Sequence, residues 1–226
     1  MDAMQVCRRD PGCRFCGFPS RMATDGFDLP IAESDHFFAL PSVGSFVPGW
    51  TLVCPKEHHL NLAGLYGTAE FVEFSSRVAS AISHAYGDTV VVFEHGCRRA
   101  GSLTGCGTDH AHLHLVPFQG SLEAAVRQFD AASQWVAGRA QDVNRLLGDR
   151  EYLLMADSLP DLRAAALFRA VEAPQSQYFR LALATALGLR SMANYRAYPF
   201  AELAVQAASR LRADLQDPVE VLQEVA

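Results

Sequence analysis

Three histidines stand at alternate positions in the segment His110–Pro117, and the residues between and after them are apolar. This alternation predicts a β-strand, in which successive side chains point to opposite faces. His110, His112 and His114 are therefore expected on one face, with their imidazoles about 6.5–7 Å apart. An imidazole can act as a metal ligand, a nucleophile or a proton carrier near neutral pH. Because three of the chain's eight histidines fall here, we interpret the segment as a working site rather than a solvated polar face.

Cys13 and Cys16 have the two-residue spacing with which a turn presents two thiolates to one zinc ion, and a tetrahedral structural site then needs two more ligands. The chain has six cysteines, spread over 226 residues rather than concentrated in a small scaffold. We therefore expect thiols or metal ligands rather than disulfides.

A glycine-rich loop is expected between His95 and Asp109, immediately before the triad. Glycines let backbone N–H groups approach phosphate oxygens closely, and arginine binds phosphate through a bidentate fork. Arg98 and Arg99 are candidates for phosphate binding, with a solvated hairpin tip as the alternative. The residues expected to face a phosphate most directly are those nearest the triad: Gly105, Gly107 and Thr108.

Gln177 and Arg180 lie three residues apart at the start of a predicted helix. Free N–H groups and the helix dipole favour an anion at such a position. We hypothesise that both side chains reach the part of a substrate that leaves during the reaction. The alternative is a capped surface helix without a ligand.

The segment His110–Val116 matches in full the pattern His-φ-His-φ-His-φ-φ, in which φ is apolar, and resembles the signature of the histidine-triad superfamily of nucleotide hydrolases and transferases. The resemblance covers about residues 10–120 and includes three upstream segments: Cys13–Cys16, Val47–His58 and Phe93–Gly96. It implies an α+β fold, an antiparallel sheet with one long helix. It also implies His112 as the nucleophile and His114 as a charged donor to a phosphate oxygen or the leaving group.

Family members with this Cys-x-x-Cys complete a structural zinc site with the histidine of a Pro-Lys-x-His segment and the first triad histidine. The resemblance thus implies Zn²⁺ held by Cys13, Cys16, His58 and His110, which would tie the N-terminal segment to the strand of the nucleophile. Three alternatives stay open: His59 replaces His58, Cys7 replaces Cys13, or His58 hydrogen-bonds His110 beside two metal-free cysteines.

The resemblance also places a nucleoside between the first hairpin and the long helix. The apolar wall for the base is expected from three residues of this hairpin: Phe38, Leu40 and Val43. Ser42 stands where a partner for the ribose hydroxyls is expected. Because serine is a weaker partner than a carboxylate, Glu94 or His95 is expected to compensate.

The first half of the chain has the elements to position these residues. Apolar residues recur at helical spacing over 69–86, where Thr68 can cap the start and Gly87 can end the helix. Strands are expected at residues 36–40, 50–54 and 89–94 and in the triad segment. We assign residues 1–120 to a histidine-triad-like catalytic domain.

Residues 121–226 are expected to form an α-rich extension packed on this domain. Its predicted elements are a long amphipathic helix over 121–147, a strand pair at 151–156 and 164–171, a helix capped by Ser176 that runs to Leu187, a helix over 201–211, and a last one opened by Asp217-Pro218.

A formal charge of −6 argues against a duplex nucleic-acid partner, which requires a basic face. No apolar run approaches the roughly 20 residues of a membrane span, and residues 1–12 lack the apolar segment of a signal peptide. We therefore expect a cytoplasmic protein that binds a small nucleotide and no membrane. A homodimer stays open.

The function that these residues predict is nucleotide hydrolysis at the α-phosphate of a nucleotide conjugate or a dinucleoside polyphosphate, through a nucleotidyl-His112 intermediate. One alternative is a transferase or phosphorylase that passes the nucleotidyl group to phosphate or a sugar phosphate. Another is a catalytically silent, zinc-stabilised nucleotide-binding protein. A metal hydrolase with all three triad histidines as ligands is disfavoured, because alternate strand residues bracket one ion poorly.

Overall fold

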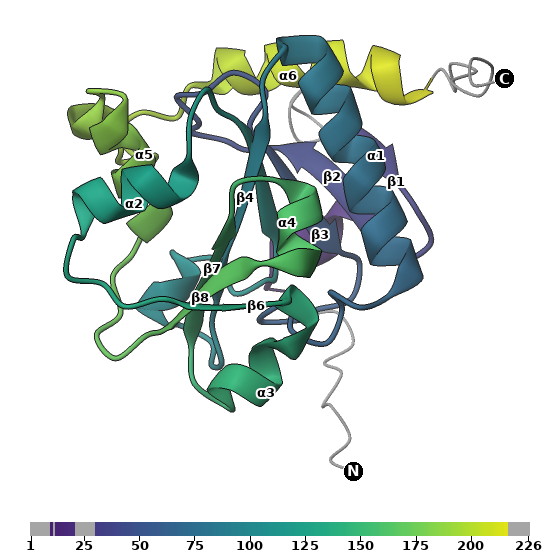
Figure 1. Ribbon diagram of the computed structural model, residues 1–226. Coiled ribbons are helices and arrows are strands. Elements are labelled where there is room, and N and C mark those ends of the chain that lie inside the picture. The colour runs from purple at the N-terminus through teal and green to yellow at the C-terminus, as the bar shows by residue number, and fades with distance from the viewer. Residues whose placement is uncertain (1–9, 11, 21–29, 217–226) are drawn as a thin grey trace, which may run out of the picture.

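The computed structural model describes residues 10, 12–20 and 30–216. Within them a single antiparallel sheet of eight strands has the order β1-β2-β3-β5-β4-β7-β8-β6 (Figure 1). The strands are β1 (Ala32–Glu33), β2 (Phe37–Pro41), β3 (Thr51–Pro55), β4 (Val90–Gly96), β5 (Leu113–Pro117), β6 (Val136–Gly138), β7 (Tyr152–Ala156) and β8 (Ala166–Ala170). The α-helices are α1 (Ala69–Tyr86), α2 (Leu122–Phe129), α3 (Val143–Leu147), α4 (Leu159–Ala164), α5 (Tyr178–Ala186) and α6 (Ala201–Gln216). Short 3₁₀ helices are η1 (Phe15–Ser20), η2 (Leu103–Gly105), η3 (Ala140–Asp142) and η4 (Arg190–Met192). The predicted α+β class is confirmed.

Helix α1 has the predicted bounds and caps. The Thr68 hydroxyl accepts a hydrogen bond from the Phe71 N–H, and Gly87 ends the helix with a φ of 73°, a conformation that suits glycine. The face of α1 that packs on the sheet is apolar and includes Phe74, Val78 and Ile82. Burial of this face, rather than helix propensity alone, stabilises the element.

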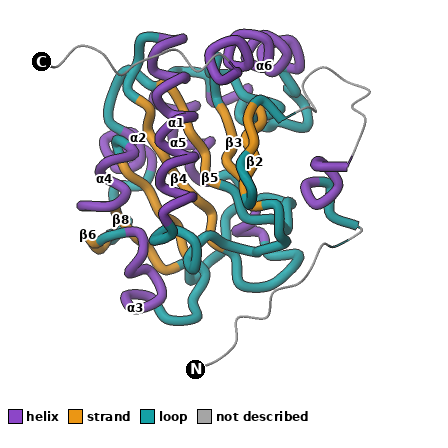
Figure 2. The backbone as a smooth tube through the Cα atoms, turned by 90° about the vertical axis from the view of Figure 1, so that its right-hand side faces the viewer, coloured by secondary structure: helices purple, strands orange, loops and turns teal. Residues whose placement is uncertain are grey.

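Helices cover the two faces of the sheet in separate groups. Figure 1 shows α1 on one side of the central strands and α2 with α5 on the other, and Figure 2 shows α6 beside β2 and β3. The side chains of β4 alternate between the two cores that result: Val92 packs with α1, whereas Val91 and Phe93 pack with α2 and α5. Glu94 therefore faces the α1 side and His95 the α2/α5 side.

The sheet continues from the first half of the chain into the second. Strand β7 pairs with β4, so that Phe93 lies opposite Met155, and β8 and β6 extend the sheet beyond β7. The second half of the chain thus contributes three strands to the sheet (β6, β7 and β8) and also the helices α2 and α5, which cover the face that carries His114. The predicted strand pair is confirmed as β7 and β8, with the short helix α4 between them.

The single helix predicted over 121–147 is wrong. Helix α2 ends at Phe129, because residues distant in sequence bind Asp130. Its carboxylate accepts hydrogen bonds from Arg169 in β8 (2.6 Å) and from the Tyr178 hydroxyl in α5 (3.0 Å). The next residues form β6, which pairs with β8, and then η3 and α3. Contacts with segments distant in sequence outweigh the helical periodicity here.

Ser176 does not cap α5, contrary to the prediction. The N-cap is Gln177, whose φ of 62° is left-handed and whose backbone N–H donates to Cys106 Sγ at 3.0 Å. The predicted helix after Asp217 and the alternative ligand Cys7 lie outside the described residues. Among the helices that are described, none has the length and apolar character that crossing a membrane requires.

Candidate active site and metal site

The triad segment is a strand only in its second half. His114 belongs to β5, whereas His110 and His112 precede the strand. The rings of His112 and His114 are 4.7 Å apart, closer than the expected strand spacing, and inclined at 69°. The reason is that His112 lies in an irregular stretch, where its Nδ1 folds back to the His110 carbonyl at 2.7 Å.

The bond to the His110 carbonyl fixes the tautomer of His112. A carbonyl oxygen can only accept, so Nδ1 carries the proton and Nε2 keeps its lone pair. Burial lowers the pKa of His112, and the bond to the carbonyl acts in the opposite direction. The lone pair on Nε2 is what a nucleophilic imidazole requires.

In His114 the ring nitrogens have the opposite hydrogen-bonding roles to those in His112. The Trp50 indole N–H donates to His114 Nδ1 at 2.9 Å, so this nitrogen is an acceptor and Nε2 carries the remaining N–H. Burial lowers the pKa of His114 well below its usual value, and the nearby His112, His95 and Arg180 lower it further. His114 is therefore a neutral hydrogen-bond donor, which corrects the expected charged one.

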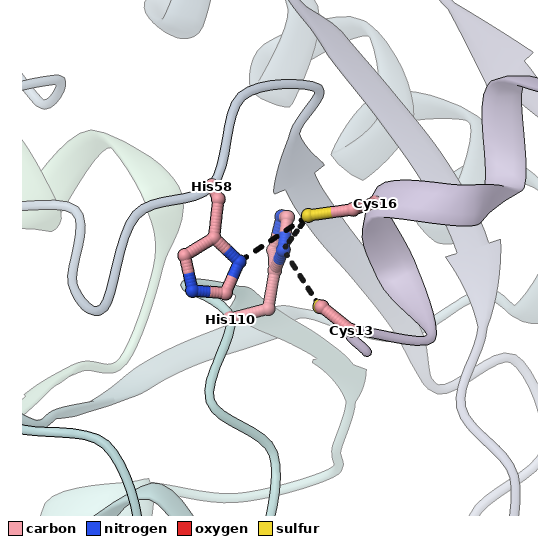
Figure 3. A group of neighbouring side chains, drawn as sticks. All are labelled: Cys13, Cys16, His58 and His110. Atoms are coloured by element: carbon pink, nitrogen blue, oxygen red, sulfur yellow. Dashed lines mark hydrogen bonds between the residues drawn. The ribbon is translucent and has the colours of Figure 1, made fainter. Parts of the chain in front are cut away.

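Figure 3 shows the four predicted zinc ligands with their side chains pointing toward one another. Their ligand atoms all lie within 4.8 Å of each other. His110 Nδ1 lies 3.4 Å from Cys13 Sγ and 3.6 Å from Cys16 Sγ, and His58 Nδ1 lies 3.2 Å from Cys16 Sγ. Bonds of about 2.3 Å to sulfur and 2.0–2.1 Å to nitrogen give tetrahedral edges of about 3.3–3.8 Å, and these three distances are close to that range.

The second ring nitrogen of His110 supports the same reading. Its Nε2 donates to the Pro55 carbonyl at 2.8 Å, which leaves the Nδ1 lone pair directed at the cysteines. His59 lies outside the cluster, with its Nε2 3.8 Å from a Glu57 carboxylate oxygen. His58 and His110 each face a cysteine, in contrast to the metal-free alternative in which they bond each other. The residues fit a four-coordinate structural metal ion.

An open cavity of about 140 Å³ lies against the triad on the α2/α5 face of the sheet. His112 and His114 line it together with seven other residues singled out from the sequence: Leu40, Ser42, Val43, His95, Thr108, Gln177 and Arg180. The cavity is also lined by seven further residues: Arg14, Phe15, Trp50, Leu52, Phe93, Cys106 and Tyr195. Among these, Trp50 carried a signal in the sequence, since it opens the second predicted strand beside the triad.

Four predicted binding residues do not line this cavity. Phe38 is fully buried in the core, and Glu94 faces α1, where its carboxylate accepts bonds from the Leu62 N–H, the Tyr66 hydroxyl and the Tyr152 hydroxyl. The other two are Gly105, which packs on Cys97, and Gly107, which approaches Arg196.

The two arginines of the glycine-rich loop are also directed elsewhere. Arg98 donates to Asn144 and to the Gly148 carbonyl, and Arg99 lies 3.9 Å from Glu151. These contacts tie the loop to the second half of the chain. Neither side chain lines the cavity beside the triad.

Arg180 is the buried cation of the site. Its Nε donates to the Ala193 carbonyl at 2.6 Å, and its guanidinium lies over the rings of Phe46 and Trp50, 5.0 and 5.2 Å from their centroids. Burial lowers the pKa of Arg180 to about 10, so the side chain keeps its charge at neutral pH. The structure thus brings Arg180, from the second half of the chain, to the same cavity as the triad.

No family model matches this chain, and no curated protein matches it either. Solved structures similar to it include a HIT-like protein involved in cell-cycle regulation from Bartonella henselae, with 24% identity, 39% of this chain and 67% of that chain covered, and a TM-score of 0.31. A hypothetical histidine triad nucleotide-binding protein from Sulfolobus tokodaii has 17% identity, 91% and 98% coverage, and a TM-score of 0.38. Both of these proteins are named as histidine-triad or HIT-like.

Proposed function

We propose that the chain is a histidine-triad nucleotide hydrolase that cleaves at the α-phosphate through a nucleotidyl-His112 intermediate. The observation that carries the proposal is the pairing of two tautomers in one cavity. His112 offers a free Nε2 lone pair, and His114, with its ring 4.7 Å away, offers an Nε2–H. A nucleophile next to a donor for phosphate oxygens is what two-step nucleotidyl transfer needs.

In the first step, the lone pair of His112 Nε2 forms a bond to the α-phosphorus, and the bond from phosphorus to the leaving oxygen breaks with its electron pair on that oxygen. The His112 Nδ1–H stays bonded to the His110 carbonyl, which stabilises the positive charge that develops on the ring. His114 Nε2–H donates to a phosphate oxygen or to the leaving oxygen.

In the second step, water attacks the same phosphorus. The new O–P bond replaces the N–P bond, whose electron pair returns to His112 Nε2, and the water's second proton passes to solvent. The products are a nucleoside monophosphate and the free leaving group, and His112 regains its neutral tautomer. Transfer to phosphate or a sugar phosphate differs only in the acceptor that replaces water.

Cys13, Cys16, His58 and His110 are the residues that would hold a zinc ion. The ion would supply structural cross-linking and no reaction chemistry, because all four coordination positions are taken by protein. Phe15, next to this cluster, packs edge-on against the rings of His110 and His112 at 5.6 and 5.9 Å. The metal cluster therefore supports the position of the nucleophile.

Peptide mass spectrometry tests this function directly. The protein is mixed briefly with diadenosine tetraphosphate, adenosine 5′-phosphoramidate or a nucleoside diphosphate sugar, then quenched and digested. We expect a nucleotidyl adduct on the peptide that contains His112, with turnover of at least one probe. His84→Asn is the matched control, because His84 lies on the exposed face of α1 and contacts only Asp214 among its charged neighbours.

Two outcomes separate the alternatives. Binding of a probe without an adduct or turnover favours the silent nucleotide-binding protein. Equal turnover by wild type and His112→Ala excludes the nucleotidyl-histidine pathway. A small-molecule nucleotide as the partner, a cytoplasmic location and the open question of a homodimer stay predictions from the sequence.

A further inference from the structure

Three residues in the described part of the chain have buried side-chain polar atoms without a hydrogen-bond partner, and all three line the cavity beside the triad. They are His95 with both ring nitrogens, Gln177 with Oε1, and Arg180 with Nη2. A buried polar atom without a partner is unfavourable, because it has lost its bonds to water. Three such residues around one cavity indicate a ligand that supplies the missing partners.

The charge of the cavity indicates the sign of that ligand. Arg180 is only 7% exposed, and its single protein hydrogen bond goes to a neutral carbonyl. Among the described residues that line the cavity, none is acidic. The rings of Phe46 and Trp50 offset part of the cost of burying this cation, but a buried charge without a counter-ion is unfavourable until an anion pairs with it.

Arg180 is also connected to the reaction centre. Its guanidinium lies over the indole of Trp50, and the same indole N–H donates to His114. An anion held by Arg180 is therefore close to the donor that faces the leaving oxygen. The second half of the chain, which supplies Arg180 and Gln177 on α5 and its cap, builds this part of the cavity.

The tautomer of His114 restricts the chemistry of the leaving group. With Nδ1 occupied by the Trp50 N–H, His114 can donate a hydrogen bond but has no second proton to give away. An amine or an alkoxide must gain a proton as it departs. A phosphate departs as a stable anion and needs only hydrogen bonds and a cation, which His114 and Arg180 provide.

We propose that Arg180, with His95 and Gln177, forms a subsite for a phosphate group on the far side of the scissile bond from the nucleoside. The inference rests on the proposed function and narrows its substrate class. The phosphate is either the leaving group of a nucleoside polyphosphate or an inorganic phosphate that accepts the nucleotidyl group from His112. In both cases Arg180 and His95 donate to the phosphate oxygens, and the Gln177 amide oxygen accepts from a protonated one.

Calorimetric titration with inorganic pyrophosphate tests the subsite without any turnover. We expect wild type to bind the probe and Arg180→Gln to bind it at least about tenfold more weakly. Arg180→Lys, which keeps the charge but loses the fork, should lie between them. Arg190→Gln is the matched control, because Arg190 is an exposed arginine four residues past the end of α5 and donates to the Thr185 hydroxyl. Circular dichroism checks that each variant folds, and the lysine variant decides if the glutamine variant does not.

Turnover gives a second, independent measurement. The ratio of kcat/KM for diadenosine tetraphosphate to that for adenosine 5′-phosphoramidate should fall at least about tenfold in Arg180→Gln, because only the first probe has a phosphate leaving group. When inorganic phosphate is added during turnover, an Arg180-dependent appearance of nucleoside diphosphate assigns the subsite to an acceptor. Nucleoside monophosphate alone assigns it to the leaving group.

The failures can be told apart. If neither probe is turned over and no adduct forms on His112, the proposed function is wrong, while the pyrophosphate titration still decides the subsite. Absence of pyrophosphate binding by wild type, or equal binding by wild type and both Arg180 variants, overturns the subsite. An unchanged ratio of kcat/KM in Arg180→Gln overturns it as well, even if His112 proves to be the nucleophile.

Discussion

Glu94 and His95 are neighbours in β4, and they face opposite sides of the sheet into very different surroundings. Every hydrogen bond that the Glu94 carboxylate accepts comes from a protein group: the Leu62 N–H at 2.6 Å and the hydroxyls of Tyr66 and Tyr152. His95 has neither ring nitrogen bonded. On the α1 face, the buried carboxylate of Glu94 thus has its hydrogen-bond partners within the protein. On the α2/α5 face, the ring nitrogens of His95 have no partner among the described residues.

The three histidines of the triad segment show the same contrast between polar atoms bonded within the protein and polar atoms open to the cavity. His110 bonds the Pro55 carbonyl through one nitrogen and faces two cysteines with the other, so all its bonding capacity is committed to structure. His112 and His114 each have one nitrogen committed to a protein partner and one directed at the cavity. Side-chain type alone does not separate these roles, because all three residues are histidines. The roles differ because the second ring nitrogen faces the cysteines in His110 and the cavity in His112 and His114.

The largest expected effect comes from the cavity side, with His112→Ala. Loss of the nucleophile should lower kcat/KM at least about 10³-fold, because no other described group in the cavity offers a fixed imidazole lone pair beside His114. Stability should change little, since the ring makes one hydrogen bond, to the His110 carbonyl. Steady-state kinetics and thermal unfolding measure the two quantities. A fall in activity that is matched by global unfolding would contradict the expectation.

Loss of the proposed zinc site should affect both stability and the triad, because His110 is one of the four ligands and lies two residues before His112. Cys13→Ser/Cys16→Ser should reduce zinc from one ion per chain to none, as measured by atomic emission on the purified protein. The melting temperature should fall by about 10 °C or more, because a structural zinc ion contributes folding free energy directly. Cys97→Ser is the control: Cys97 donates to the Leu60 carbonyl and lies outside the cluster. Full zinc content in the double variant would exclude this site.

Trp50→Phe should remove the hydrogen bond that the Trp50 indole N–H donates to His114 Nδ1 in the cavity. The ring still packs on Phe46 and Phe93, but His114 Nδ1 loses its donor. We expect kcat/KM to fall about 10- to 100-fold, since the orientation of a catalytic imidazole depends on such a partner. The pKa of His114 should rise, so a new ionisation should appear in the pH–rate profile. Trp135→Phe, whose indole bonds only Ser133, should leave the profile unchanged.

The residues of the two clusters were predictable from the sequence, and the partners that define their roles were not. The residues of Cys13–Cys16 and of the triad are close in sequence, so they lie close together in space whatever fold the rest of the chain adopts. Gln177 and Arg180 were singled out from their spacing, but the route by which Arg180 reaches the cavity depends on the left-handed backbone of Gln177 and on where α2 ends. That end is set by Asp130 pairing with Arg169, a contact between residues 39 positions apart. Hydrophobic periodicity carries no record of such pairings.

The last expected effect lies on the α1 face, leaves the cavity untouched, and concerns the dependence of stability on pH. Burial raises the pKa of Glu94 to about 7, although the bonds from Tyr152, Tyr66 and the Leu62 N–H oppose the shift. In the unfolded chain this carboxyl titrates near its ordinary value of 4.5. Between these two values the folded state holds a proton that the unfolded state has lost. The free energy of unfolding should therefore fall as pH rises from about 4.5 to 7, by about 3 kcal/mol at most, and change no further above that.

Glu94→Gln isolates this contribution, because an amide of the same shape cannot ionise. Urea unfolding at pH 5, 6, 7 and 8 should give a decline in stability for wild type that is absent in Glu94→Gln, and the variant should gain most relative to wild type at pH 8. Glu123→Gln, which removes only an exposed pair with Arg127, should keep the wild-type decline. If Glu94→Gln shows the same pH dependence as wild type, the carboxylate is not held protonated, and the α1 face tolerates a buried charge because its three donors suffice.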